Sequence, residues 1–139
     1  MLRRLKPMCI MALLICWLAG ERLEAQRSAV STLRGPDAET LLQQGQPVEA
    51  LPILNQLHKA QPNNVRVCYQ LGLAYTQLQE LNKAAEFYRK ALKLNPGFVA
   101  ARKNLGTVLW FSNQKEASVQ EFRTVLRSLP NDPVSHLYL

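Results

Sequence analysis

The sequence predicts an all-α fold in which tandem antiparallel helical hairpins follow one another and stack as an α-solenoid. Hydrophobic residues recur at helical spacing through most of residues 36–139. The pattern repeats with a period of 34 residues, which aligns Gly72 with Gly106 and Pro96 with Pro130. A fixed period of this length is typical of repeat proteins, in which each unit buries its hydrophobic face against its neighbours.

Residues 1–25 have the composition of a secretory signal peptide. Three basic residues among the first six precede a hydrophobic run at residues 8–19. This run is shorter than the roughly 20 residues that a membrane-spanning helix needs. We therefore expect an exported protein, periplasmic or secreted, with cleavage after Ala25 or Gly20. The alternative is an uncleaved signal segment that anchors the chain to the membrane, which would be its only membrane contact.

The first hairpin, residues 36–64, is expected to be a degenerate repeat that follows a polar tether at residues 26–35. Its helices are predicted at 37–44 and 48–60. Pro52 lies past the first turn of the second helix, where proline removes a hydrogen bond and favours a kink. The expected buried faces contain Ala38, Leu41 and Leu42 in the first helix and Ala50, Leu54 and Leu57 in the second.

Residues 65–98 form the most complete unit, with two amphipathic helices, a polar turn and a closing Asn95-Pro96-Gly97. We expect Gly72 and Ala84 where the two helices cross, because a larger side chain there would push the axes apart. The expected structural residues are Leu71, Gly72, Tyr75, Ala84, Tyr88, Ala91 and Pro96.

Residues 99–132 repeat the pattern less strictly, with helices predicted at 99–112 and 115–129. Residues 133–139 begin one further first helix, here a truncated one. Three roles are open for that helix: it caps the third hairpin, it continues into a longer protein, or it pairs with another chain. The corresponding structural residues are Leu105, Gly106, Phe122 and Pro130, with Leu109, Ser118 and Val125 at the remaining places.

These residues resemble the tetratricopeptide repeat family, whose pattern is a leucine–glycine pair, an aromatic residue, an alanine, a second aromatic residue, another alanine and a proline. Residues 65–98 match every place in this pattern. The resemblance extends over about 36–139 and implies a short right-handed superhelix whose first helices line a concave surface. It also implies a scaffold that binds a protein or peptide partner.

The helical period places one set of side chains on the face that points away from the partner helix. Arg66 and Lys103 would bind an acidic group of an extended peptide, and Tyr69 and Trp110 would contact its apolar side chains. The alternative for Trp110 is that it packs, with Phe111, under residues 133–139. The predicted partner-binding residues are Arg66, Tyr69, Leu73, Thr76, Lys103, Thr107 and Trp110.

Composition and motifs argue against several other functions. The net charge is +7, but the basic residues are spread over both helices of the repeat and form no stripe for nucleic acid. Cys68, the single cysteine outside the N-terminal segment, is expected to be a small core residue. His58 and His136 are expected on the surface. The sequence contains no metal-binding spacing, phosphate loop or nucleophile motif, so we predict no enzyme activity, metal or cofactor.

The sequence therefore predicts an exported, non-enzymatic scaffold. Two alternatives remain open. In the first, the chain is a self-associating element that forms a homo-oligomer. In the second, it is the targeting fragment of a longer repeat-containing protein or enzyme. The sequence does not identify the partner.

Overall fold

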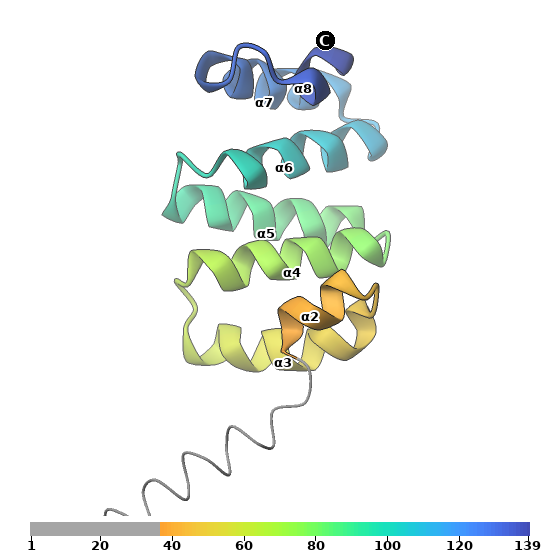
Figure 1. Cartoon of the computed structure of the whole chain (residues 1–139), viewed down its shortest axis with the longest axis vertical. Helices are drawn as coiled ribbons and strands as arrows, with labels where there is room; N and C mark the ends of the chain where they lie inside the picture. The colour runs from red at the N-terminus through yellow and green to blue at the C-terminus, as the bar shows by residue number, and fades with distance from the viewer. Residues whose placement is uncertain (1–36) are drawn as a thin grey trace, which may run out of the picture. The chain divides into compact units, whose positions relative to one another are not determined.

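The computed structural model describes residues 37–139, which form helices joined by short turns and contain no strand. Successive helices pack against one another along the stack in Figure 1. This confirms the predicted all-α solenoid of antiparallel hairpins. The predicted signal peptide and tether lie outside the described residues. The helices are α2 (Ala38–Gln43), α3 (Pro47–Ala60), α4 (Val65–Gln77), α5 (Leu81–Leu94), α6 (Val99–Phe111), α7 (Lys115–Ser128) and α8 (Pro133–Leu137).

The turns within the hairpins repeat with the same 34-residue period as the hydrophobic pattern. Gly45, Gln79 and Asn113 each adopt a positive φ, of 72°, 61° and 62°. The residue after each of them donates its backbone N–H to a carbonyl five residues earlier, at 2.8, 2.9 and 2.8 Å. Such hydrogen bonds are typical of a helix C-terminus that ends at a residue in the left-handed conformation. The first helix of each hairpin therefore ends in the same type of turn.

The connections between hairpins are also periodic. Backbone N–H groups at Asn64, Phe98 and Asp132 donate to the carbonyl three residues earlier, at 3.2, 3.1 and 3.1 Å. A proline is the second residue of each turn, where its fixed φ is favourable. Asn64 also caps α4, because its side chain accepts from the N–H groups of Arg66 and Val67.

The centre of the core lies where the two helices of a hairpin cross. Tyr88 and Phe122 are fully buried there, and their rings lie against Gly72 and Gly106. Ser118 takes the place that Ala84 holds in the preceding unit, and its hydroxyl donates to the carbonyl of Gly106 at 2.7 Å. The expected crossing of small and aromatic residues is therefore present in both units.

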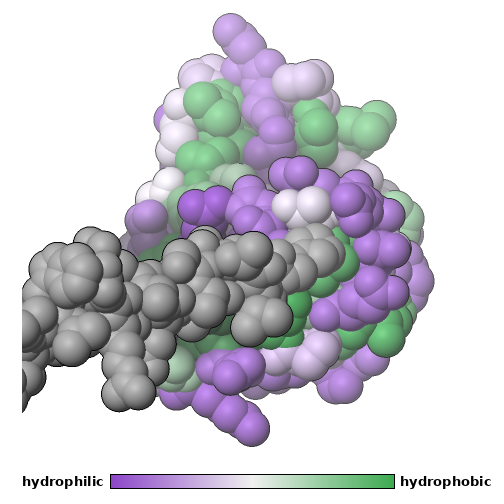
Figure 2. Space-filling model, turned by 60° about the horizontal axis from the view of Figure 1, so that its bottom comes forward, coloured by the Kyte–Doolittle hydropathy of each residue, from purple (hydrophilic) through white to green (hydrophobic). Residues whose placement is uncertain are grey.

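Leu57 is not part of the buried face predicted for α3. Ala50 and Leu54 are fully buried, but Leu57 is 40% exposed. The described α2 has six residues against fourteen in α3, so it is too short to cover the C-terminal half of its partner. Figure 2 brings this end of the molecule forward and shows hydrophobic patches between hydrophilic residues.

Pro52 does not end α3, which continues to Ala60. The side chain is on the exposed side of the helix, and so is Val48, whose carbonyl would otherwise accept the missing hydrogen bond. Water can reach that carbonyl, which explains why the helix tolerates a proline there.

Candidate functional site

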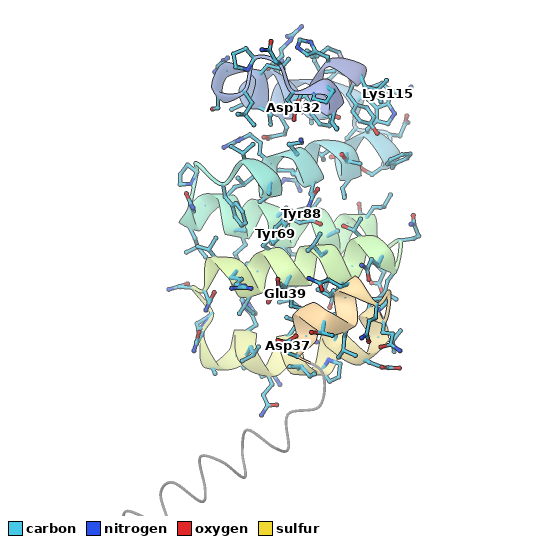
Figure 3. The ribbon with its side chains drawn as sticks, viewed as in Figure 1. Asp37, Glu39, Tyr69, Tyr88, Lys115 and Asp132 are labelled. Carbon is cyan, nitrogen blue, oxygen red and sulfur yellow. The ribbon has the colours of Figure 1, made fainter. Side chains whose placement is uncertain are left out.

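A groove of about 610 Å³ is formed by α2, α4 and the connection between α5 and α6. It lies on the first helices of the first and second hairpins, α2 and α4, whereas the predicted groove lay on those of the second and third, α4 and α6. Figure 3 labels Glu39 and Tyr69, which come from its α2 and α4 walls. Its lining consists of Glu39, Leu42, Gln43, Val65, Arg66, Tyr69, Gln70, Leu73, Gln77, Asn95 and Phe98.

Tyr69 is held in place by contacts with three neighbours. Its ring centroid lies 4.8 Å from that of Phe98 and 5.9 Å from that of Tyr88. Its hydroxyl accepts a hydrogen bond from the side-chain amide of Asn104 at 3.1 Å. The ring is half-buried, so it presents a preorganised aromatic edge to the groove.

Arg66 lines this groove, and it is already paired with a carboxylate of this chain. Its guanidinium forms an ion pair and hydrogen bond with Glu39 of α2. Gln70 donates to the same Glu39 oxygen at 3.3 Å. The Arg66 and Glu39 side chains remain 72% and 44% exposed, so a ligand can reach both members of the pair.

A polar contact also fixes α2 against α4. The side-chain amide of Gln77 donates to the backbone carbonyl of Leu42 at 2.9 Å, near the end of α2. The same carbonyl also accepts from the backbone N–H of Gly45 at 3.1 Å, so Gln77 adds a second hydrogen bond at this helix end. The two walls of the groove are therefore linked at both ends, by Gln77 and by the Arg66–Glu39 pair.

Leu73 also lines this groove, but the remaining predicted binding residues, Thr76, Lys103, Thr107 and Trp110, do not. The Thr76 hydroxyl donates to the carbonyl of Gly72 at 2.8 Å and lies 3.0 Å from the hydroxyl of Tyr88. The Thr107 hydroxyl donates to the carbonyl of Lys103 at 3.1 Å. These threonines are tied to their own helices and to the hairpin core.

Lys103 of α6 pairs at 2.5 Å with Asp132, the residue that precedes α8. Asp132 is labelled in Figure 3. The Asp132 side chain is 8% exposed and also accepts from the N–H and hydroxyl of Ser135, both at 2.8 Å. The hydrogen bond from Lys103, with those from Ser135, lowers the pKa of Asp132 to about 2 against the opposing effect of burial. Asp132 followed by proline is a helix N-terminus signal, but nothing in the sequence indicates Lys103 as its partner.

Trp110 contacts the C-terminal segment, in agreement with the alternative considered for it. Its ring lies 5.2 Å from that of Tyr138 in an edge-on arrangement, and Tyr138 stacks on Phe122 at 4.8 Å. Phe111 does not share this packing and is 66% exposed. Residues 133–139 therefore cover the third hairpin, and Trp110 belongs to that contact rather than to the groove.

His58 is not the free surface residue that was expected. Its Nε2 lies 2.9 Å from Nζ of Lys90, its Nδ1 lies 4.0 Å from Sγ of Cys68, and its ring meets Phe87 edge-on at 5.7 Å. Burial, and then the charge of Lys90, lower the pKa of His58. Burial raises the pKa of the Cys68 thiol. Cys68 is fully buried and matches the core role predicted for it.

Two further features are absent from residues 37–139. This part of the chain has no cluster of three or more histidine, cysteine or acidic side chains placed to bind a metal ion. None of its helices combines the length and hydrophobicity needed to cross a bilayer.

Residues 65–98 match the family model described as tetratricopeptide repeat. The fold is similar to the MamA RS-1 ArsTM double mutant, with a TM-score of 0.69 and 27% identity over 73% of this chain and 57% of that chain. MamA 41-end from Desulfovibrio magneticus RS-1 gives a TM-score of 0.64 and 29% identity over 68% of this chain and 54% of that one. This chain thus spans little more than half of either protein.

A human protein shares the fold alone. The second repeat domain of RPAP3, solved in complex with the HSP70 peptide SGPTIEEVD, has a TM-score of 0.69 and 20% identity over 73% of this chain and 85% of that chain. These likenesses confirm the repeat at residues 65–98 and the solenoid architecture around it.

Proposed function

We propose that this chain is a non-enzymatic scaffold that binds a protein or peptide partner in the groove between α2, α4 and the α5–α6 connection. The observation that carries this proposal is a preformed, largely apolar hollow on the first-helix face, with Tyr69 and Phe98 fixed against each other at its edge. Binding sites are commonly concave, mostly apolar and already formed before the ligand arrives.

A peptide is the partner class that the shape supports. The groove follows two adjacent helices and has a volume of about 610 Å³, which suits a few side chains of an extended segment. The RPAP3 domain of the same fold was solved with a bound peptide, which supports this class of partner for the chain.

A capture experiment tests the proposed function. The full chain is immobilised beside two groove variants, Tyr69→Ala and Leu73→Gln, and one matched variant on an exposed face of α7, Arg123→Ala. Melting curves first establish that all four proteins are folded. We expect specific partners to be recovered by the wild type and Arg123→Ala and lost from both groove variants. Equal recovery by all four proteins would show that the groove is not the binding site.

Export is a separate proposal, based on the basic start and hydrophobic run of residues 1–25. Fractionation of cells that express the full chain tests it. An exported chain appears in the extracytoplasmic fraction, shortened at its N-terminus or held on the membrane by the uncleaved segment. Uncleaved chain in the cytoplasm would contradict this proposal without affecting the proposed groove.

Self-association is a second candidate function, favoured by the exposed hydrophobic side chains of the C-terminal segment. Val134 is 38% exposed, Leu137 78% and Leu139 54%. Ultracentrifugation of the full chain over a wide concentration range tests this candidate. A mass that rises with concentration and returns to that of the monomer in Leu137→Ser supports it, and a constant monomer mass excludes it.

A further inference from the structure

We propose that the groove selects an uncharged, apolar peptide segment, and that Glu39 is the residue that excludes acidic ones. This inference rests on the proposed function and names its ligand class. It differs from the expectation drawn from the sequence, in which Arg66 and Lys103 were to bind an acidic group.

The lining of the groove has no net charge. It contains one acidic and one basic residue, and these two are paired with each other. The remaining side chains are five apolar or aromatic residues and four amides. Amides both donate and accept hydrogen bonds, so they match the backbone of an extended segment without requiring charge on it.

Arg66 is the only cation in the lining, and Nη2 of its guanidinium is paired with the carboxylate of Glu39. A ligand carboxylate at this position would have to displace Glu39 or lie beside it as a like charge. Gln70 holds the same Glu39 oxygen, at 3.3 Å, and so favours the present position of the carboxylate. An incoming acidic group therefore meets repulsion where a free arginine would have attracted it.

Lys103 does not replace Arg66 as an anion site. It lies outside the lining, and its ammonium is 2.5 Å from Asp132, which is itself buried and held by Ser135. The two cations on which acidic recognition would depend are thus each bound to a carboxylate of this chain.

The apolar residues form two adjoining contact regions. Leu42 and Leu73 lie where α2 meets α4, and Tyr69 and Phe98 lie at the α5–α6 end. Two apolar side chains of one extended segment would each find a region, and the amides of Gln43 and Asn95 line the same groove. This arrangement supplies hydrophobic contact and neutral hydrogen bonds, the combination that an uncharged segment needs.

Fluorescence anisotropy with three labelled nonapeptides of equal length tests the inference on the full chain. The first alternates leucine and glutamine and has acetylated and amidated ends; the second and third replace two glutamines by glutamate or by lysine. We expect the neutral peptide to bind wild type about tenfold more tightly than the acidic one. In Glu39→Gln the acidic peptide should gain about tenfold, because Arg66 becomes available, while the neutral peptide changes little.

Glu116→Gln, which removes an exposed acid from the first turn of α7, is the matched control and should leave all three affinities unchanged. Tighter binding of the acidic peptide to wild type, an unchanged preference in Glu39→Gln, or no binding of the neutral peptide would each overturn the inference. In those cases the capture experiment still tests the proposed function separately. If Tyr69→Ala and Leu73→Gln fail to recover the partner, the proposed function is retained. Equal capture by every variant would reject the proposed function itself.

Discussion

The ring of Tyr88 occupies the space that a side chain at Gly72 would need. A Cβ built on Gly72 would lie 2.5 Å from Cε1 and 2.6 Å from Cδ1 of that ring. Phe122 stands in the same relation to Gly106, with 2.9 Å to its Cε2. The missing Cβ in each unit lets the two helices of a hairpin pack around one aromatic ring, and this spacing positions α4 as a wall of the groove.

Gly72→Ala should destabilise the protein, although alanine is the better helix former by about 1 kcal/mol. Tyr88 is fully buried and its hydroxyl lies 3.0 Å from that of Thr76, so the ring cannot move aside without losing contacts. Overpacking of a core costs about 1–3 kcal/mol, and after the gain in helix propensity we expect a net loss of up to about 2 kcal/mol in urea unfolding.

Gly97→Ala is the matched control for this substitution. A Cβ there would lie 3.5 Å from the nearest atom, the side-chain oxygen of Asn95, which is an ordinary contact. Its stability should stay within about 0.5 kcal/mol of wild type. A Gly72→Ala variant as stable as Gly97→Ala would contradict the proposed role of the glycine.

Gln79→Gly should stabilise the second hairpin. Gln79 has φ 61°, a conformation that a residue with a Cβ adopts only at a cost. Glycine removes that cost, but it loses more conformational entropy on folding than glutamine does. The expected net gain in stability is about 0.5–1 kcal/mol. Gln120→Gly, in the exposed middle of α7, should instead lose about 1 kcal/mol. Equal effects of the two substitutions in thermal unfolding would show that the turn at Gln79 is not strained.

Acid should release the C-terminal segment through Asp132. Its pKa is lowered to about 2, so its carboxylate stabilises the folded segment fully above its unfolded pKa of about 3.9. That stabilisation, about 2 kcal/mol, is lost as the pH falls from about 4 to 2. Trp110 reports the release because it lies against Tyr138, and replacing Trp17 by Phe leaves Trp110 as the single tryptophan.

Lys103→Met serves as the comparison for this titration. Without the ammonium, the pKa of Asp132 should rise, and the fluorescence transition of Trp110 should move to higher pH. A transition at the same pH in both proteins would show that the Lys103–Asp132 pair does not control the release of the segment.

His58 should titrate below its ordinary pKa of 6.5. Burial is the larger cause and the charge of Lys90 the smaller one, so the fold favours the neutral ring. The contribution of His58 to stability is therefore present above pH 6.5 and is lost as the pH falls through 6.5 toward the lower folded pKa. NMR titration of the ring protons should show a partial rise of this pKa in Lys90→Met. A pKa at or above 6.5 in wild type would contradict the contact.

Local chemistry and the period made much of the fold predictable from the sequence. Gly72 and Gly106, and the aromatic residues that pack on them, recur at one spacing, so a single complete unit predicts its neighbour. The predicted burial of Leu57 was wrong. Whether Leu57 is buried depends on the length of α2, and the hydrophobic pattern of α3 does not predict that length.

The site was less predictable, because its electrostatics depend on pairs far apart in the chain. Arg66 lines the groove, but the pairing of its charge with Glu39 spans 27 residues. Lys103, which was expected to bind an acidic group of the partner, is instead paired with Asp132, 29 residues away. Helical periodicity assigns a residue to a face, and it carries no information on which opposite charge lies across the next helix.

Photo-crosslinking from inside the groove is the most direct test of where the partner binds. A photoreactive phenylalanine analogue replaces Leu73 in one protein and Arg123, on the exposed side of α7, in another. If the groove binds the partner, the captured protein or peptide will crosslink from position 73 and will not crosslink from position 123. Crosslinking from position 123 alone, or equally from both positions, would contradict a binding site in the groove.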